Sequence, residues 1–165
     1  MALKVALVMG SDSDLPVVQK AAEVLDKFGV SYEMHIMSAH RTPEEATAFA
    51  RGARASGFGV LVGFAGMAAH LSGVLAACTT LPVVGVPCKG GALDGLDALL
   101  ATVQMPAGVP VATVALGGGA NAALLAVQIL ALQDEELVQK LEDEKLAMRH
   151  AVQKKNEALH NKIYN

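Results

Sequence analysis

One short stretch of the sequence places groups that could bind an anion and transfer a proton side by side. Ser38-Ala-His-Arg-Thr42 carries His40 next to Arg41. An imidazole exchanges a proton near neutral pH, and a guanidinium offers a planar set of donors for phosphate or carboxylate. Ser38 adds a hydroxyl group to the same stretch. We therefore expect this segment to contribute to a binding or catalytic site.

A second histidine, His70, has a different setting. The residues around it are small: Gly66, Ala68, Ala69 and Gly73. Small residues let a ligand or another backbone segment approach closely. A single histidine in apolar surroundings is also common as a core residue, so His70 alone has two interpretations.

Gly10-Ser-Asp-Ser-Asp14 is a candidate phosphate-binding turn. The backbone N–H groups at the start of a helix, with the hydroxyls of Ser11 and Ser13, would suit an anion. Asp14 could accept hydrogen bonds from sugar hydroxyls. Ser and Asp are also favoured helix N-caps, so plain capping is the alternative. The sequence contains no nucleophile elbow, no P-loop and no cluster with metal-ligand spacing, which leaves acid–base chemistry by histidine.

These segments lie between short apolar runs and helical patterns. The runs predict strands at 5–9, 30–37, 60–64, 83–86 and 111–116. The helical patterns cover 15–28, a segment starting at Pro43 after Thr42, and 70–78, 94–103 and 120–132. Such alternation predicts an α/β fold with a parallel sheet covered by helices on both faces. Flavodoxin-like and Rossmann-like strand orders both fit, and in either the ligands bind at the carboxyl ends of the strands.

The sequence after Asp134 differs from the rest, because charges of both signs return in large numbers. Its apolar residues form one stripe: Leu137, Leu141, Met148, Val152, Leu159 and Ile163. We therefore divide the chain into a catalytic domain at 1–133 and an amphipathic helical tail of the same domain at 134–165. The tail is expected to pack on a neighbouring subunit, and packing on its own subunit is the alternative.

The composition excludes several classes of protein. Of the 165 residues, 53% are hydrophobic and 18% are charged, which excludes a disordered chain, and a net charge of -3 argues against nucleic-acid binding. Two long stretches without charges, at 55–88 and 98–133, are interrupted by glycine and proline, so we do not expect them to span a membrane. The chain shows no signal peptide, and Cys78 and Cys88 lack any metal-ligand spacing. We expect a cytoplasmic protein with reduced thiols.

Several motifs, in order over about residues 4 to 132, resemble one enzyme family. They are Met9-Gly-Ser-Asp-Ser-Asp14, Ser38-Ala-His-Arg-Thr-Pro43, Ala65-Gly-Met-Ala-Ala-His-Leu-Ser-Gly73, Leu81-Pro-Val-Val-Gly-Val-Pro87, Val103-Gln-Met-Pro106 and Asn121-Ala-Ala-Leu-Leu-Ala126. The chain is similar in these motifs to the class I 5-(carboxyamino)imidazole ribonucleotide mutases of de novo purine synthesis.

The resemblance implies a flavodoxin-like three-layer α/β/α subunit with about five parallel strands, assembled as a homo-octamer. The activity implied is an isomerase reaction that moves a carboxylate from the exocyclic nitrogen of the imidazole ribonucleotide to a ring carbon. It implies His40 and His70 as catalytic residues. Substrate contacts are implied at Ser11, Ser13, Asp14, Ser38 and Arg41. No metal or organic cofactor is implied, and an ATP-dependent synthetase would supply the substrate.

From the chemistry of that reaction we infer a small dry pocket for CO2, formed by Gly66, Ala68 and Ala69. The chain departs from the family pattern at Met67, where Gly is usual, at Ser72, where Pro is usual, and at Cys88-Lys-Gly-Gly91. The alternatives are direct carboxylation of aminoimidazole ribonucleotide by CO2 and a non-catalytic nucleotide-binding homologue. Arg41 and His70 favour the mutase, because the direct carboxylases resemble Ser-Ala-His-Lys in the second loop and lack Ala-Ala-His-Leu.

Overall fold

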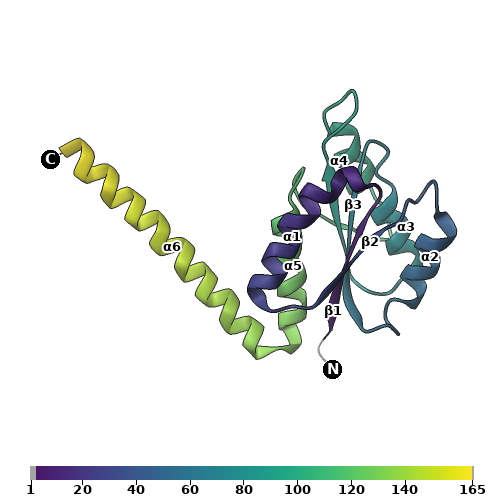
Figure 1. Cartoon of the computed structure of the whole chain (residues 1–165), viewed down its shortest axis with the longest axis horizontal. Helices are drawn as coiled ribbons and strands as arrows, with labels where there is room; N and C mark the ends of the chain where they lie inside the picture. The colour runs from purple at the N-terminus through teal and green to yellow at the C-terminus, as the bar shows by residue number, and fades with distance from the viewer. Residues whose placement is uncertain (1–2, 165) are drawn as a thin grey trace.

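A computed structural model of the chain describes residues 3–164 and has a central sheet of five parallel strands (Figure 1). Residues 1–2, at the start of the predicted catalytic domain, lie outside the described residues. So does residue 165, at the end of the predicted tail. The strands are β1 (Lys4–Met9), β2 (Tyr32–Ile36), β3 (Phe58–Gly66), β4 (Val83–Cys88) and β5 (Ala112–Thr113). Their order, β2-β1-β3-β4-β5, is flavodoxin-like, which decides between the two orders that the strand pattern left open.

Helices cover both faces of this sheet, as the alternation predicted. They are α1 (Leu15–Phe28), α2 (Pro43–Gly52), α3 (Leu71–Cys78), α4 (Leu96–Val103), α5 (Gly119–Leu130) and α6 (Glu135–Tyr164), with 3-10 turns η1 (Asp12–Asp14) and η2 (Ala131–Gln133). Helices α1 and α5 pack together on one face, and α2 packs with α3 on the other. The three-layer α/β/α prediction is therefore confirmed.

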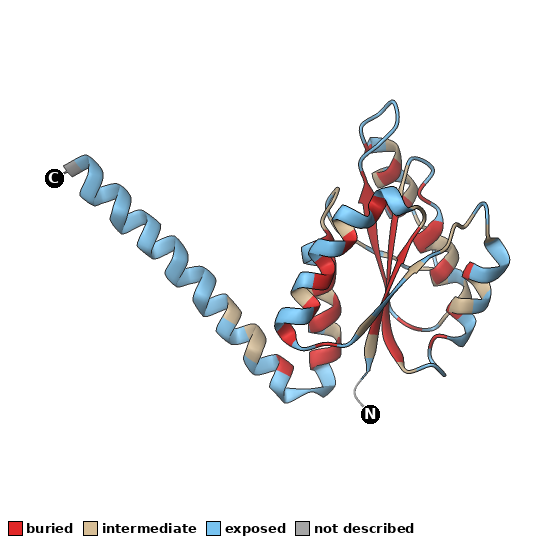
Figure 2. Cartoon of the chain, in the orientation of Figure 1, coloured by how far each residue is buried: buried red, intermediate tan, exposed pale blue. Residues whose placement is uncertain are grey.

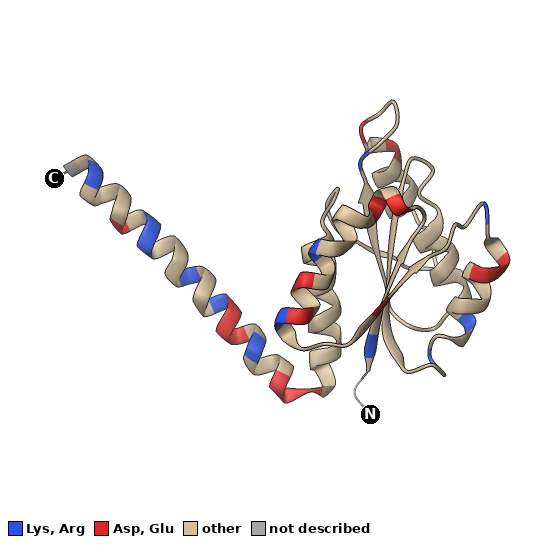
Figure 3. Ribbon diagram, viewed as in Figure 1, with Lys and Arg blue, Asp and Glu red and all other residues tan. Residues whose placement is uncertain are grey.

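The side chains of β1 show why its sequence is a continuous apolar run. Val5, Leu7 and Met9 belong to the core beneath α1 and α5. Ala6 and Val8 belong to the core beneath α2 and α3. All five are buried, because a strand inside a parallel sheet is covered on both faces (Figure 2). Charged residues accordingly gather on the helices rather than in the sheet (Figure 3).

The last strand is much shorter than predicted. The run 111–116 was expected to be a strand, but only Ala112 and Thr113 join the ladder, opposite Val84 and Gly85. The chain continues beside β4 through single hydrogen bonds, from Val114 N to the Gly85 carbonyl and from the Gly117 backbone N–H to Pro87. An apolar run therefore follows the sheet edge here without forming a regular strand.

Helix α4 begins two residues later than the predicted start at residue 94. Asp94 and Gly95 both have positive φ, at 47° and 97°, so neither can continue a right-handed helix. The 3-10 turn η2 likewise replaces the end of the helix predicted at 120–132.

Helix α6 starts against the domain and then leaves it (Figure 1). The Asp134 carboxylate accepts hydrogen bonds from the backbone N–H groups of Glu136 and Leu137, at 3.0 and 3.2 Å, and so caps the helix. Leu137 is buried, and Leu141 packs against the same core. The 30 residues form a helix about 45 Å long, most of which is exposed (Figure 2). No helix within residues 3–164 is long and apolar enough for a membrane span.

Candidate active site

The loops that follow the first four strands surround one hollow at the carboxyl edge of the sheet. Its volume is about 640 Å³. Eight of the predicted site residues line it: Ser11, Ser13, Asp14, Ser38, His40, Arg41, Gly66 and Ala68. The parallel sheet explains this convergence, because the carboxyl ends of all its strands meet at one edge.

His40 and His70 lie in direct contact. The His40 Nε2 and His70 Nδ1 atoms are 2.9 Å apart, and the two rings meet edge to face at 81°. His40 follows β2, whereas His70 immediately precedes α3, where its carbonyl accepts a hydrogen bond from Val74. Both side chains are exposed at the edge of the sheet. His70 is therefore a neighbour of His40 and not a core residue.

Arg41 is held in place by its own loop. Its Nη2 atom donates to the Gly10 carbonyl at 2.8 Å, and its Nε atom donates to the Ser38 hydroxyl at 3.4 Å. The Ser38 backbone N–H donates in turn to the Thr42 hydroxyl at 2.8 Å, which closes the loop before α2. Arg41 also borders a second, smaller hollow of about 390 Å³. Arg41 therefore lines two adjoining hollows, which also share Gly10, Ser11 and Ser38.

The first loop presents its serines and buries its last carboxylate. The Ser11 hydroxyl accepts a hydrogen bond from Ser13 N at 3.4 Å and donates to Asp12 at 3.0 Å, so part of the predicted capping role is real. Asp14 is only 7% exposed, and this burial raises the pKa of its carboxyl group. Hydrogen bonds from the Cys88 thiol and from the Ser11 backbone act in the opposite direction, while the nearby Asp12 charge adds to the rise.

Cys88 is the buried partner of Asp14. Burial, together with the charge and the hydrogen bond of Asp14, raises the pKa of the Cys88 thiol to about 12. The thiol therefore remains protonated at neutral pH, and its Sγ atom donates a hydrogen bond to the Val86 carbonyl at 3.6 Å. No local pattern indicated the contact between Cys88 and Asp14, because the two residues are far apart in the chain.

The segment between β3 and His70 forms one wall of the hollow. Gly66 and Ala68 line it, but Ala69 is 1% exposed and packs within the protein instead. Met67 also lines the hollow, with 61% of its surface exposed and a positive φ of 52°. The long Met67 side chain therefore lines the same hollow as the residues inferred to hold CO2.

The fourth loop was not among the predicted site segments. Lys89, Gly90 and Gly91 line the hollow. Their position after the apolar run 83–86 was the available signal, because it places them at the same sheet edge as the other three loops.

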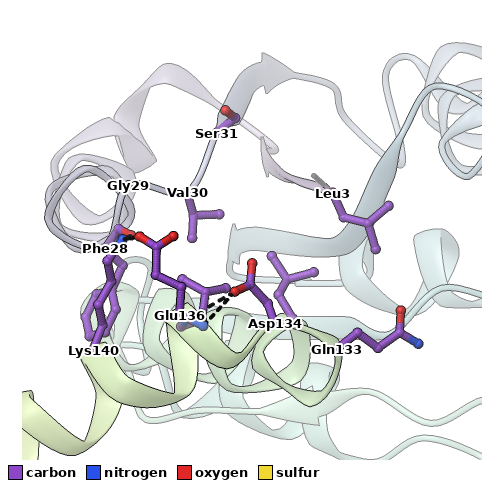
Figure 4. A pocket seen from close by; sticks show the side chains of 11 residues that line it. Leu3, Phe28, Gly29, Val30, Ser31, Gln133, Asp134, Glu136 and Lys140 are labelled. Carbon is purple, nitrogen blue, oxygen red and sulfur yellow. Dashed lines mark hydrogen bonds and ion pairs between the residues drawn. The ribbon is translucent and has the colours of Figure 1, made fainter. Parts of the chain in front are cut away.

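A further hollow of about 300 Å³ lies at the other end of the sheet, near Leu3 and Ser31 (Figure 4). Its polar groups already have structural roles. Lys140 donates to the Phe28 carbonyl at the end of α1, at 3.0 Å, and pairs with Glu136 at 2.7 Å. Asp134 caps α6. This hollow lies where α6 packs against the domain, and it is not our candidate for the catalytic site.

The family model described as AIR carboxylase matches residues 4–151. The chain belongs to the AIR carboxylase family. The match includes all four loops around the hollow and the first half of α6. Both His40 and His70 lie within the matched residues.

Named relatives of this family are similar over most of their length. The N5-carboxyaminoimidazole ribonucleotide mutase of Pyrococcus abyssi is 57% identical over 138 residues, which cover 84% of this chain and 79% of that protein. The mutase of Brucella melitensis biotype 1 is 51% identical over 154 residues, covering 92% and 95%. The crystal structure of Treponema denticola PurE is 30% identical, covers 98% of both chains and has a TM-score of 0.82.

Proposed function

We propose that this chain is an N5-carboxyaminoimidazole ribonucleotide mutase of de novo purine synthesis. It converts 5-carboxyamino-1-(5-phosphoribosyl)imidazole reversibly to 5-amino-1-(5-phosphoribosyl)imidazole-4-carboxylate. Relatives bearing that name, at up to 57% identity, support the activity. The structural observation that carries the proposal is the 2.9 Å contact between His40 and His70 beside a hollow lined by anion-binding groups.

The reaction needs one group that gives a proton and later takes one back. Protonation of the carbamate nitrogen breaks its bond to the carboxylate and releases CO2. The C4 carbon of the ring then attacks CO2 and forms the new C–C bond, and loss of the C4 proton to a base restores the aromatic ring. The proton gained at nitrogen balances the proton lost from carbon. We assign both transfers to His40, which lines the hollow.

His70 acts through His40. A hydrogen bond between two imidazoles requires one nitrogen to donate and the other to accept, so the His70 Nδ1 contact holds the orientation of His40 and couples the tautomers of the two rings. We therefore assign His70 the role of positioning residue. It supports proton transfer without contacting the reacting atoms.

The remaining residues hold the ribonucleotide and the released gas. Arg41, with the hydroxyls of Ser11, Ser13 and Ser38, binds the phosphate, and Asp14 accepts hydrogen bonds from the ribose hydroxyls. Gly66 and Ala68 confine CO2. Holding the reactants in this orientation lowers the activation barrier of the reaction by on the order of several kcal/mol.

The assembly and the setting form part of the same proposal. Exposed apolar side chains on α4 (Leu96, Leu100 and Val103) and on α6 support a homo-octamer in which these faces meet other subunits. Two free cysteines support a cytoplasmic location. An ATP-dependent synthetase would make the unstable substrate.

One assay tests the activity and separates it from both alternatives. Purified protein is given the carboxyamino substrate in buffer free of CO2 and bicarbonate, and the 4-carboxylate product is followed. We expect turnover well above the uncatalysed rate. Activity only with aminoimidazole ribonucleotide and added CO2 would identify a direct carboxylase. Nucleotide binding without turnover of either substrate would identify a non-catalytic homologue.

A further inference from the structure

The loop after β4 lines the hollow, yet the mechanism above gives it no role. Lys89, Gly90 and Gly91 stand in the segment where the chain departs from the family pattern. Gly91, Asp94 and Gly95 all have positive φ values. Lys89 directly follows the last residue of β4, and this places it at the wall of the hollow.

Met67 and Gly91 join this loop to the CO2 wall. A Cβ atom on Gly91 would lie 3.2 Å from the Met67 Cγ atom, so the absence of a side chain at position 91 makes room for Met67. On the same wall, a Cβ atom on Gly66 would lie 3.8 Å from the Lys89 carbonyl oxygen. Two departures from the family pattern thus touch each other, and Lys89 lies beside the residues proposed to confine CO2.

The ammonium group of Lys89 is held only weakly. Its Nζ atom lies 3.4 Å from the Asp94 carboxylate, and both side chains are mostly exposed, at 66% and 81%. Exposed pairs of this kind contribute about 0–1 kcal/mol. Lys89 can therefore exchange Asp94 for an anionic group of a ligand at little cost.

The charges of the substrate and of the hollow indicate which anionic group of the ligand Lys89 would bind. The substrate carries a phosphate and a carboxylate, and Arg41 and Lys89 are the permanently cationic residues among those described along the hollow. Arg41 lies on the β2 side, beside the second hollow and the serines that suit the phosphate. Lys89 lies on the β4 side, where its backbone carbonyl is close to Gly66, one of the residues proposed to confine CO2.

We propose that Lys89 binds the carboxylate group of the substrate and the product, and so recognises the carboxylated imidazole. This inference rests on the proposed function. It predicts that Lys89 discriminates between the 4-carboxylate product and 5-amino-1-(5-phosphoribosyl)imidazole, which has the same ribose phosphate but no carboxylate.

Calorimetric titration of the full chain with both ribonucleotides tests the proposal. Lys89→Gln should weaken binding of the 4-carboxylate product about tenfold, as expected for a hydrogen bond to a charged group, and leave binding of the decarboxylated nucleotide within about twofold. Lys89→Arg should bind the product within about threefold of the wild type. Lys20→Gln, at an exposed position on α1, is the matched control and should change neither affinity.

Two other outcomes would overturn the inference about Lys89. Equal weakening for both nucleotides would place Lys89 on the phosphate, and unchanged product binding by Lys89→Gln would remove it from recognition altogether. Failure of the wild-type chain to bind either nucleotide would instead contradict the proposed function, so the two failures are distinct.

Discussion

His40 Nε2 lies 2.9 Å from His70 Nδ1 although the two histidines follow strands that are not neighbours in the sheet. β1 lies between β2 and β3, and it is followed directly by Gly10, which has no side chain. A Cβ atom there would already touch the Phe64 carbonyl and the Ala65 side chain, at 3.7 and 3.9 Å. The histidine pair therefore spans the end of the central strand, and its geometry depends on three strands at once.

His40→Asn should reduce kcat about a thousandfold while the product binds with an affinity within threefold of the wild type. Asparagine keeps a polar group in the hollow but cannot transfer a proton near neutral pH, and acid–base catalysis typically contributes about 10²–10⁴-fold. Steady-state kinetics and calorimetry measure the two quantities. A variant that retained more than a tenth of the wild-type kcat would contradict the role of His40.

His70→Asn should cost less, about ten- to a hundredfold in kcat, because His40 keeps its proton but loses its orientation. The double variant with His40→Asn should be no slower than His40→Asn alone, since a positioning residue has nothing left to position. Comparison of the three kcat values measures this coupling. Additive losses would show that His70 acts independently of His40.

Asp14→Asn should lose activity and gain stability at neutral pH. Burial raises the pKa of Asp14, so the folded state favours its protonated form; that contribution is present below the ordinary value of 3.8 and is lost as the pH rises through the raised pKa. At pH 7 the wild type bears a buried charge that asparagine lacks. The kcat/KM should fall by about ten- to a hundredfold, because ribose contacts to a charged acceptor are lost.

Urea unfolding of wild type and Asp14→Asn at two pH values checks the sign. The variant should have the larger free energy of unfolding at pH 7, and the difference should shrink below about pH 4. A variant that is less stable at pH 7 would mean that the hydrogen bonds from Cys88 and Ser11 outweigh the cost of burial.

Gly119→Ala should destabilise the fold by about 1–3 kcal/mol. A methyl group at position 119 would overlap the backbone carbonyl of Val17, which cannot move away as a flexible side chain could. This contact holds α5 against α1, the helix that follows the serine loop. Gly52→Ala is the control, since position 52 has open space around it and should gain up to about 1 kcal/mol. Equal unfolding midpoints for the two variants would contradict the prediction.

Charges placed on the exposed stripe of α6 should weaken the proposed assembly. Val152 and Leu159 are 67% and 54% exposed in the single chain, so replacing both with lysine should leave the domain folded and reduce the octamer to smaller species. Gln153→Lys, on the same helix, adds charge outside the stripe and serves as the control. Sedimentation velocity measures the outcome, and a wild-type monomer in dilute buffer would contradict the octamer itself.

Much of this architecture was predictable, because strands buried inside a parallel sheet appear in the sequence as continuous apolar runs. The run at Val5–Met9 is apolar at every position since both of its faces are covered. Once the sheet is parallel, the loops after its strands must meet, so the convergence of Ser11, Ser38 and His40 follows from chain order.

Other features depend on three-dimensional contacts that no local pattern encodes. The interaction between Cys88, at the end of β4, and Asp14, in η1, joins segments that are far apart in the chain. The two-residue β5 reflects how far the chain follows β4, and not the apolar character of 111–116. On α6, the stripe looked uniform, yet Leu137 is buried and Val152 is exposed, because the helix leaves the domain after its first turns.

The central place of β1 also sets an order of events during synthesis. β1 ends at Met9, but its partner β3 begins at Phe58, so a chain growing at about 5–20 residues per second leaves one edge of β1 unpaired for several seconds. During that time an apolar strand is exposed on both faces. The nascent chain is therefore most vulnerable to aggregation early, and cells that make it quickly would depend on chaperones that cover its first strand.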